Sequence, residues 1–285
     1  MGISLAEAHV LFSLKRRGAL GDEFLSLGRP EIYISKRELQ GLVSAYDLSW
    51  SENDISRATS AAYAEPLLQL LGFRTVRSLD ISAYQGANII HDLNWPIPKE
   101  FEATTTFLYG NGTIEHVFDI ATALKNVVRL LRVGGMVVIA GPANGYCGHG
   151  FYQFSPELFY NVLSLNGFDH VRVYIVGRSY PQRWFRAANP KELKRRVEFM
   201  TTEPTDIIVI ACKEASFRFR VSTTERLQSA VMEHVAKRVG GSPFWVGKAA
   251  THIFQAIQAG VTHICGGPTV SYGSRNAGCS RSPAF

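Results

Sequence analysis

Hydrophobic and polar positions between residues 22 and 214 alternate between short β-rich runs and longer helical patterns. MVVIA is apolar throughout, and DIIVIA is apolar after its first residue, which is typical of central strands covered by helices on both faces. This alternation predicts an α/β fold, a Rossmann-like doubly wound sheet of about seven mostly parallel strands. The predicted strands span residues 23–27, 76–79, 88–90, 104–109, 136–140, 170–176 and 206–211.

Helical patterns separate these strands. The strongest spans residues 114–132, where apolar residues recur at three- and four-residue spacing and the glycines at 134 and 135 are expected to end the helix. A second helix is predicted over 155–165, with Ser155 as its N-cap and a proline at the first helical position. Residues 36–48 and 55–71 predict one or two helices in an unusually long first crossover.

The regular pattern ends near Glu214 and divides the chain into three parts. We expect an N-terminal helical segment over 1–21, the α/β domain over 22–214 and a basic, partly helical or disordered extension over 215–285. The extension holds amphipathic patterns at 223–239 and 248–259. Its composition is 8 Lys and Arg against 2 Asp and Glu, whereas the remainder holds 22 of each. A solvated, poorly ordered extension is the favoured interpretation, and a nucleic-acid contact is the alternative.

Several protein classes are disfavoured by composition. No stretch approaches the ~18 consecutive apolar residues that a transmembrane helix needs, so no membrane contact is expected. The chain starts with an apolar run followed by charge, the reverse of a secretory signal, and a cytoplasmic location is therefore expected. The four cysteines are far apart and form no CxxC pair or Cys/His cluster, so we expect no structural zinc, no other metal and no disulfide framework. The oligomeric state is left open.

Between residues 76 and 168 the motifs occur in a specific order. SLDIS is followed by NIIHDLNWPIP, then by FLYGNGTIEHV, RLLRVGG and FSPELFYNVLSLNGF. This order resembles the second half of a class I S-adenosylmethionine-dependent methyltransferase. The resemblance implies S-adenosylmethionine as cofactor and methyl transfer to a small-molecule acceptor, such as a sugar or another metabolite. The alternative is a methyltransferase-like protein that binds a partner without catalysis, and a dinucleotide-dependent enzyme is disfavoured because GxGxxG is absent.

The resemblance assigns cofactor contacts to residues that follow the strands, where ligands bind in open parallel sheets. Asp80 would accept hydrogen bonds from the ribose hydroxyls, although a strand-end Asp can also be solvated or cap a helix. Asp92 would reach the adenine amino group, although Asp is also a common turn residue. The remaining implied contacts are Ile81, Leu93 on the adenine ring, and Gly110 and Asn111 under the methionine part.

The first strand departs from the family pattern. The family usually has a GxGxG turn there, which lets the chain approach the cofactor without a clash from Cβ. This chain has Gly28, Arg29 and Pro30 instead. The resemblance makes Gly28 and Arg29 cofactor contacts, with Arg29 paired to the cofactor carboxylate.

Two histidines and a tyrosine are candidates for the acceptor side. His149 lies between two glycines in the loop after the fifth strand, and Tyr152 follows it. His116 lies in the IEH motif. A histidine titrates near neutral pH, so His149 or His116 could remove the acceptor proton while Tyr152 holds the acceptor. Packing roles are the alternative for both histidines.

Overall fold

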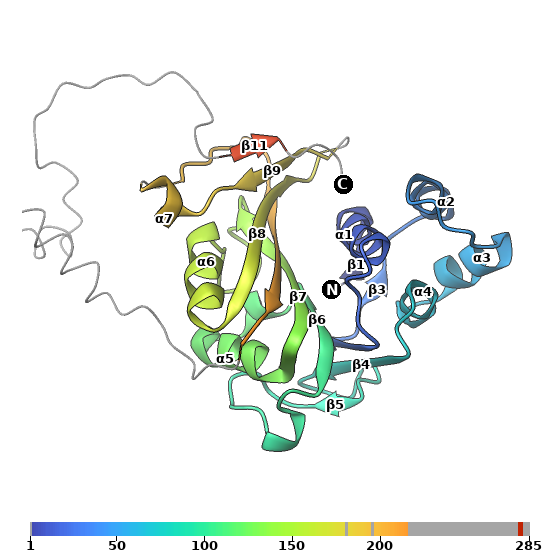
Figure 1. Ribbon diagram of the computed structural model, residues 1–285, viewed down its shortest axis with the longest axis horizontal. Coiled ribbons are helices and arrows are strands. Elements are labelled where there is room, and N and C mark those ends of the chain that lie inside the picture. Colours follow the sequence, from blue (N-terminus) through green and yellow to red (C-terminus); the bar gives the residue numbers. More distant parts are fainter. Residues whose placement is uncertain (1, 180–181, 195–196, 216–278, 282–285) are drawn as a thin grey trace, which may run out of the picture. The chain divides into compact units, whose positions relative to one another are not determined.

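A computed structural model of the chain describes residues 2–179, 182–194, 197–215 and 279–281 (Figure 1). The chain divides into two compact units, one of residues 1–220 with 276–285 and one of 221–275. The elements below belong to the first unit. The helices expected at 223–239 and 248–259, like the disorder expected at the C-terminus, lie outside the described residues.

Nine of the described strands form one large mixed sheet, whose order is β11-β9-β8-β10-β7-β6-β2-β4-β5. All seven expected strands are present in it. Strands β5, β4, β2, β6 and β7 pair in parallel, and β10 is antiparallel to both of its neighbours. The bounds are β2 (Glu23–Leu27), β4 (Thr75–Asp80), β5 (Ile89–Ile90), β6 (Thr105–Asn111), β7 (Leu131–Asn144), β8 (Phe168–Gly177), β9 (Trp184–Ala187), β10 (Thr205–Lys213) and β11 (Cys279–Arg281).

The order of the parallel strands confirms the doubly wound fold. From β2 the chain moves outward to β4 and β5, and then returns to the other side of β2 to form β6 and β7. The direction of winding therefore reverses between β2 and β6. In open α/β sheets this switch point opens a crevice beyond the carboxyl ends of the strands, where ligands bind.

Helices cover both faces of the sheet, as the apolar strands predict. Figure 1 shows α5 (Ile120–Leu130) and α6 (Pro156–Leu165) on one face, and α1 (Leu5–Arg16) and α4 (Glu65–Leu71) on the other. In β2, Leu25 belongs to the α5/α6 core and Phe24 to the α1/α4 core. Adjacent residues of a strand point to opposite faces, so a strand buried on both faces is apolar at successive positions.

The first crossover holds three helices, more than the one or two expected. They are α2 (Lys36–Ala45), α3 (Glu52–Ser60) and α4. Ser35 begins α2 and Ser51 begins α3, each in a capping box with an acidic residue three positions later. The helix predicted over 55–71 is divided in two, because α3 ends at Ser60 and α4 begins at Glu65.

The helix expected over 114–132 is shorter and interrupted, so that prediction was wrong at both ends. A 3-10 turn, η2 (Ile114–His116), comes first, and α5 begins after Asp119, whose side chain accepts a hydrogen bond from the backbone of Thr122. The helix ends at residue 130 because Leu131 already pairs with Thr105 in the sheet. The two glycines expected to end the helix therefore lie within β7.

The N-terminal segment reaches the carboxyl end of β6. Its strand β1 (Gly2–Ile3) pairs in parallel with β3 (Glu31–Ile32). The carbonyl oxygen of Gly2 accepts hydrogen bonds from the Tyr109 hydroxyl at 3.1 Å and the Asn111 amide at 2.7 Å. The remaining elements are η1 (Lys99–Phe101) and α7 (Pro190–Leu193). No helix in the described part of the chain has the length and apolar character needed to cross a bilayer.

Candidate functional site

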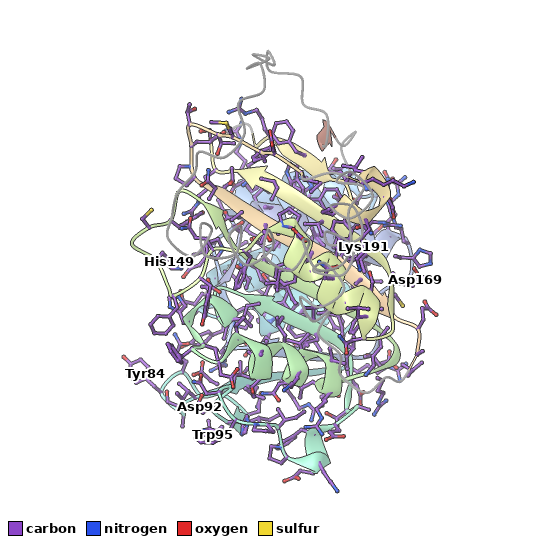
Figure 2. The ribbon with its side chains drawn as sticks, turned by 90° about the vertical axis from the view of Figure 1, so that its left-hand side faces the viewer. Tyr84, Asp92, Trp95, His149, Asp169 and Lys191 are labelled. Atoms are coloured by element: carbon purple, nitrogen blue, oxygen red, sulfur yellow. The ribbon has the colours of Figure 1, made fainter. Side chains whose placement is uncertain are left out.

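The candidate site lies at the edge of the sheet where β2, β4, β5, β6 and β7 end. Because β10 is antiparallel to these strands, its first residues reach the same edge. Figure 2 shows His149, Tyr84 and Asp92 on one side of the ribbon and Asp169, at the start of β8, on the opposite side. Most of the residues proposed from the sequence follow strands and so share one edge.

The turn after β2 is held by Arg29. Gly28 is buried with a φ of +78°, a backbone conformation that favours glycine. The Arg29 guanidinium donates to the Glu65 carboxylate at 2.7 Å and to the carbonyl oxygen of Gln85 at 2.7 Å. It also stacks 4.0 Å from the centre of the Tyr63 ring. Arg29 therefore connects the turn after β2 to the start of α4 and to the loop after β4.

Asp80 is half-buried at the end of β4. Its Oδ1 accepts a long hydrogen bond of 3.3 Å from the Ser82 amide. Ile81, the next residue, is 66% exposed. The carboxylate thus stands at the carboxyl end of β4 with an apolar neighbour at the surface, a combination that suits a ligand with hydroxyl groups and a flat ring.

Asp92 lies after β5 in a tight turn. Its Oδ1 accepts hydrogen bonds from the Asn94 backbone amide at 2.9 Å and from the Asn94 side chain at 2.8 Å. Leu93 is buried in the core under α5. Asp92 therefore makes the hydrogen bonds of a turn residue, which was the alternative interpretation of this position. Leu93 packs against other side chains of the protein.

The loop after β6 folds over the end of β2. Gly110 lies against Leu27, where an added Cβ would come within 3.3 Å of the leucine side chain. The Thr113 hydroxyl donates to the Leu27 carbonyl oxygen at 2.6 Å. Together with the contact of Asn111 to Gly2, these interactions occupy the part of the edge that the resemblance assigns to the methionine moiety.

A second group of polar residues lies across the ends of β6 and β7. Glu115 in η2 is only 1% exposed, and its carbonyl oxygen accepts a hydrogen bond from the Phe151 amide at 2.8 Å. His149 Nε2 lies 3.6 Å from Glu115 Oε1, and the rings of His149 and His116 are 4.9 Å apart. Burial raises the pKa of the Glu115 carboxyl. The structure thus brings both candidate histidines together on one buried acid.

Tyr146 and Asp206 extend this group toward β10. The Tyr146 hydroxyl donates to Asp206 Oδ1 at 2.5 Å, and the Arg178 guanidinium lies 3.8 Å from Asp206 Oδ2. Burial raises the pKa of Asp206 and that of Tyr146. Sequence reasoning missed both residues as site candidates. Only the antiparallel direction of β10 brings Asp206 to this edge, and the apolar run DIIVIA carries no sign of strand direction.

Tyr152 lies beside the histidines, with its hydroxyl directed to the backbone. It donates to the Phe118 carbonyl oxygen at 2.6 Å, and its ring stacks on Phe154. The hydroxyl therefore anchors the loop that carries His149 to the segment between η2 and α5.

Comparisons with known proteins found similar chains among solved structures. No family model and no curated protein sequence matches this chain. Among solved structures, it is similar to a SAM-dependent methyltransferase of Thermotoga maritima, with 14% identity over 72% of this chain and 91% of that one, at a TM-score of 0.33. It is also similar to a SAM-dependent methyltransferase of Archaeoglobus fulgidus, with 13% identity over 72% and 94% of the two chains, at a TM-score of 0.36. These values are low, so the fold assignment stands on the strand order of the chain itself.

Proposed function

We propose that the chain transfers a methyl group from S-adenosylmethionine to a small-molecule acceptor. The observation that carries this proposal is the position of Asp80, a half-buried carboxylate at the end of β4, beside the switch point of a doubly wound sheet. A carboxylate at that point can accept hydrogen bonds from two vicinal hydroxyls. The motif order between residues 76 and 168 supports the same assignment.

The residues fit the adenosine half of this cofactor better than its amino-acid half. Asp80 and Asp92 follow neighbouring strands, since Asp80 pairs with Ile90 in the ladder between β4 and β5. Both carboxylates are hydrogen-bond acceptors, as ribose hydroxyls and an adenine amino group require. On the other side, Arg29 already pairs with Glu65. The cofactor carboxylate would have to share Arg29 with Glu65 or displace Glu65 from it.

Each group has a defined task in the proposed reaction. The cofactor supplies an electrophilic methyl group on a sulfonium centre. The acceptor atom forms its bond to the methyl carbon as the carbon–sulfur bond breaks, and S-adenosylhomocysteine leaves. The proton of a hydroxyl acceptor would pass to His149 or His116, which lie at the same edge. Alignment of the acceptor with the methyl group supplies much of the rate enhancement in such a displacement.

A specific observation favours a second function, a methyltransferase-like protein that binds a partner without catalysis. Arg29 has protein partners on three sides, and Asn111 holds the N-terminal segment at the end of β6. A cofactor of the usual size would have to compete with these contacts. If they persist in solution, the fold would serve binding alone.

Calorimetric titration of the full chain with S-adenosylhomocysteine distinguishes the two functions. We expect saturable binding by the wild type and a loss of at least about 10-fold in affinity for Asp80→Ala, because charge-assisted hydrogen bonds contribute ~1.5–3 kcal/mol each. Asp169→Ala is the matched control, since Asp169 is an acid at the opposite edge of the sheet (Figure 2).

Two results would contradict methyl transfer. Absence of heat at millimolar S-adenosylhomocysteine, with a folded protein by circular dichroism, would favour the partner-binding function. Equal affinities of Asp80→Ala and the wild type would place any cofactor site away from β4.

A further inference from the structure

We propose that Glu115, His116 and His149 form a binding site for a divalent transition-metal ion, with zinc as the representative ion. One possible ligand atom from each residue lies within 4.8 Å of the other two. The three side chains come from η2 and from the loop after β7, which are more than thirty residues apart in sequence. This site does not depend on methyl transfer being the reaction.

The separation of His149 and Glu115 fits shared coordination better than a direct hydrogen bond. Nε2 and Oε1 are 3.6 Å apart, beyond the range of an ordinary N–H···O bond. Two ligands that bind one zinc ion at ~2.0–2.1 Å in tetrahedral geometry are separated by about 3.4 Å. A small inward movement of the exposed His149 ring would therefore bring both atoms into bonding distance of one ion.

Glu115 supplies an independent indication of a ligand. Its side chain is 1% exposed, and its buried Oε2 atom accepts no hydrogen bond from any described residue. Burial of an unpaired carboxylate is costly, and it is usually offset by a cation or a hydrogen-bond donor. A divalent ion between Glu115 and the two histidines would provide that compensation.

The backbone around the cluster keeps its members in place. The Phe151 amide donates to the Glu115 carbonyl oxygen at 2.8 Å, which fixes the loop against η2. Gly150 has a φ of +70°, and a Cβ there would lie 3.0 Å from Glu115. The His149 amide donates to the Tyr146 carbonyl oxygen at 3.0 Å within the same loop. A glycine is thus needed where the loop passes closest to the acid.

The ligand set indicates the class of ion. Two imidazoles and one carboxylate suit zinc and other first-row transition metals, whereas calcium and magnesium prefer oxygen ligands. Three protein ligands leave coordination positions open, as in catalytic rather than structural zinc sites. With an ion bound, His149 Nε2 would be a ligand. The ion itself would then lower the pKa of a coordinated acceptor hydroxyl. Only this effect on the acceptor rests on the proposed function.

Zinc titration of the full-length protein against a chromophoric chelator tests the site. We expect the wild type to bind one zinc ion. We expect Glu115→Gln and His149→Ala each to bind zinc at least about 100-fold more weakly, since even loss of an outer-shell partner typically lowers metal affinity 10- to 100-fold. His149 is 52% exposed, so its replacement should leave the fold intact. Cobalt substitution gives a second readout, a visible absorption spectrum that should disappear in both variants.

His170→Asn is the matched control. This histidine lies at the start of β8, at the opposite edge, with a φ of +52° that asparagine tolerates. The proposal would be overturned if Glu115→Gln and His149→Ala bound zinc as tightly as the wild type and the control. It would also be overturned if the wild type bound no zinc at a 100-fold excess of the ion, a concentration on the order of millimolar. Because Asp80→Ala should bind zinc normally, failure of the metal site and failure of the cofactor site give different results.

Discussion

The guanidinium of Arg29 and the carboxylate of Glu65 meet at 2.7 Å, immediately beyond the end of β2. Ala64, just before Glu65, donates its amide to the Pro30 carbonyl oxygen, so the chain returns to this turn after the excursion through α2 and α3. A glycine-rich turn would leave this space open. Here an ion pair occupies it, so in the proposed function the cofactor carboxylate would meet this pair.

Neutralising Glu65 should strengthen cofactor binding. In Glu65→Gln the Arg29 guanidinium loses its carboxylate partner and can pair with the carboxylate of S-adenosylhomocysteine. We expect affinity to rise about 2- to 5-fold, because partly exposed ion pairs contribute up to about 1 kcal/mol. Calorimetric titration measures the change, and weaker binding by Glu65→Gln would show that Glu65 itself contacts the cofactor.

Removing the contacts to Gly2 should loosen the N-terminal segment. The double variant Tyr109→Phe, Asn111→Ala leaves the Gly2 carbonyl oxygen without its two donors. We expect a loss of ~1–3 kcal/mol in the free energy of unfolding, the cost of leaving a buried polar group unpaired. Urea unfolding measures the loss, and faster amide exchange at Ile3 should accompany it. Unchanged exchange there would contradict this role of the two side chains.

Lys213 should stabilise the end of α5. Its buried Nζ donates to the carbonyl oxygens of Val128 and Leu131 at 2.7 and 2.6 Å, where the last carbonyls of a helix lack partners. Burial lowers the pKa of this lysine. Lys213→Met should reduce the free energy of unfolding by ~1–3 kcal/mol. In urea unfolding, Lys99→Met, at an exposed position, serves as control, and equal stabilities of the two variants would refute the capping role.

The contribution of Glu203 should depend on pH. Hydrogen bonds from Ser179 and Arg183 lower the pKa of its carboxyl to about 2. A pKa below the unfolded value of about 4.3 means that the stabilisation is complete above that value and is lost as the pH falls toward 2. The difference in urea midpoint between the wild type and Glu203→Gln should therefore shrink between pH 6 and pH 3. A difference that stays constant would show that the ionised form makes no special contribution.

The sequence alone determined the elements that depend on local pattern. All seven predicted strands are present, because a run of apolar residues buried on both faces is visible without knowledge of the partner strands. The N-cap position of Ser155 was also predicted correctly, because the proline that follows it at the first helical position is a local signal; the Ser155 side chain itself makes no capping hydrogen bond.

The tertiary structure decided every relationship between distant residues. Leu131 became a strand residue because it pairs with Thr105, although its local pattern continues a helix. Arg29 meets Glu65 because the crossover returns to the turn after β2 at the start of α4, and His149 approaches Glu115 because β6 and β7 end at one edge of the sheet. Local hydrophobic periodicity says which residues are buried, but it does not say which strand lies beside which or in what direction, and those two facts create the site.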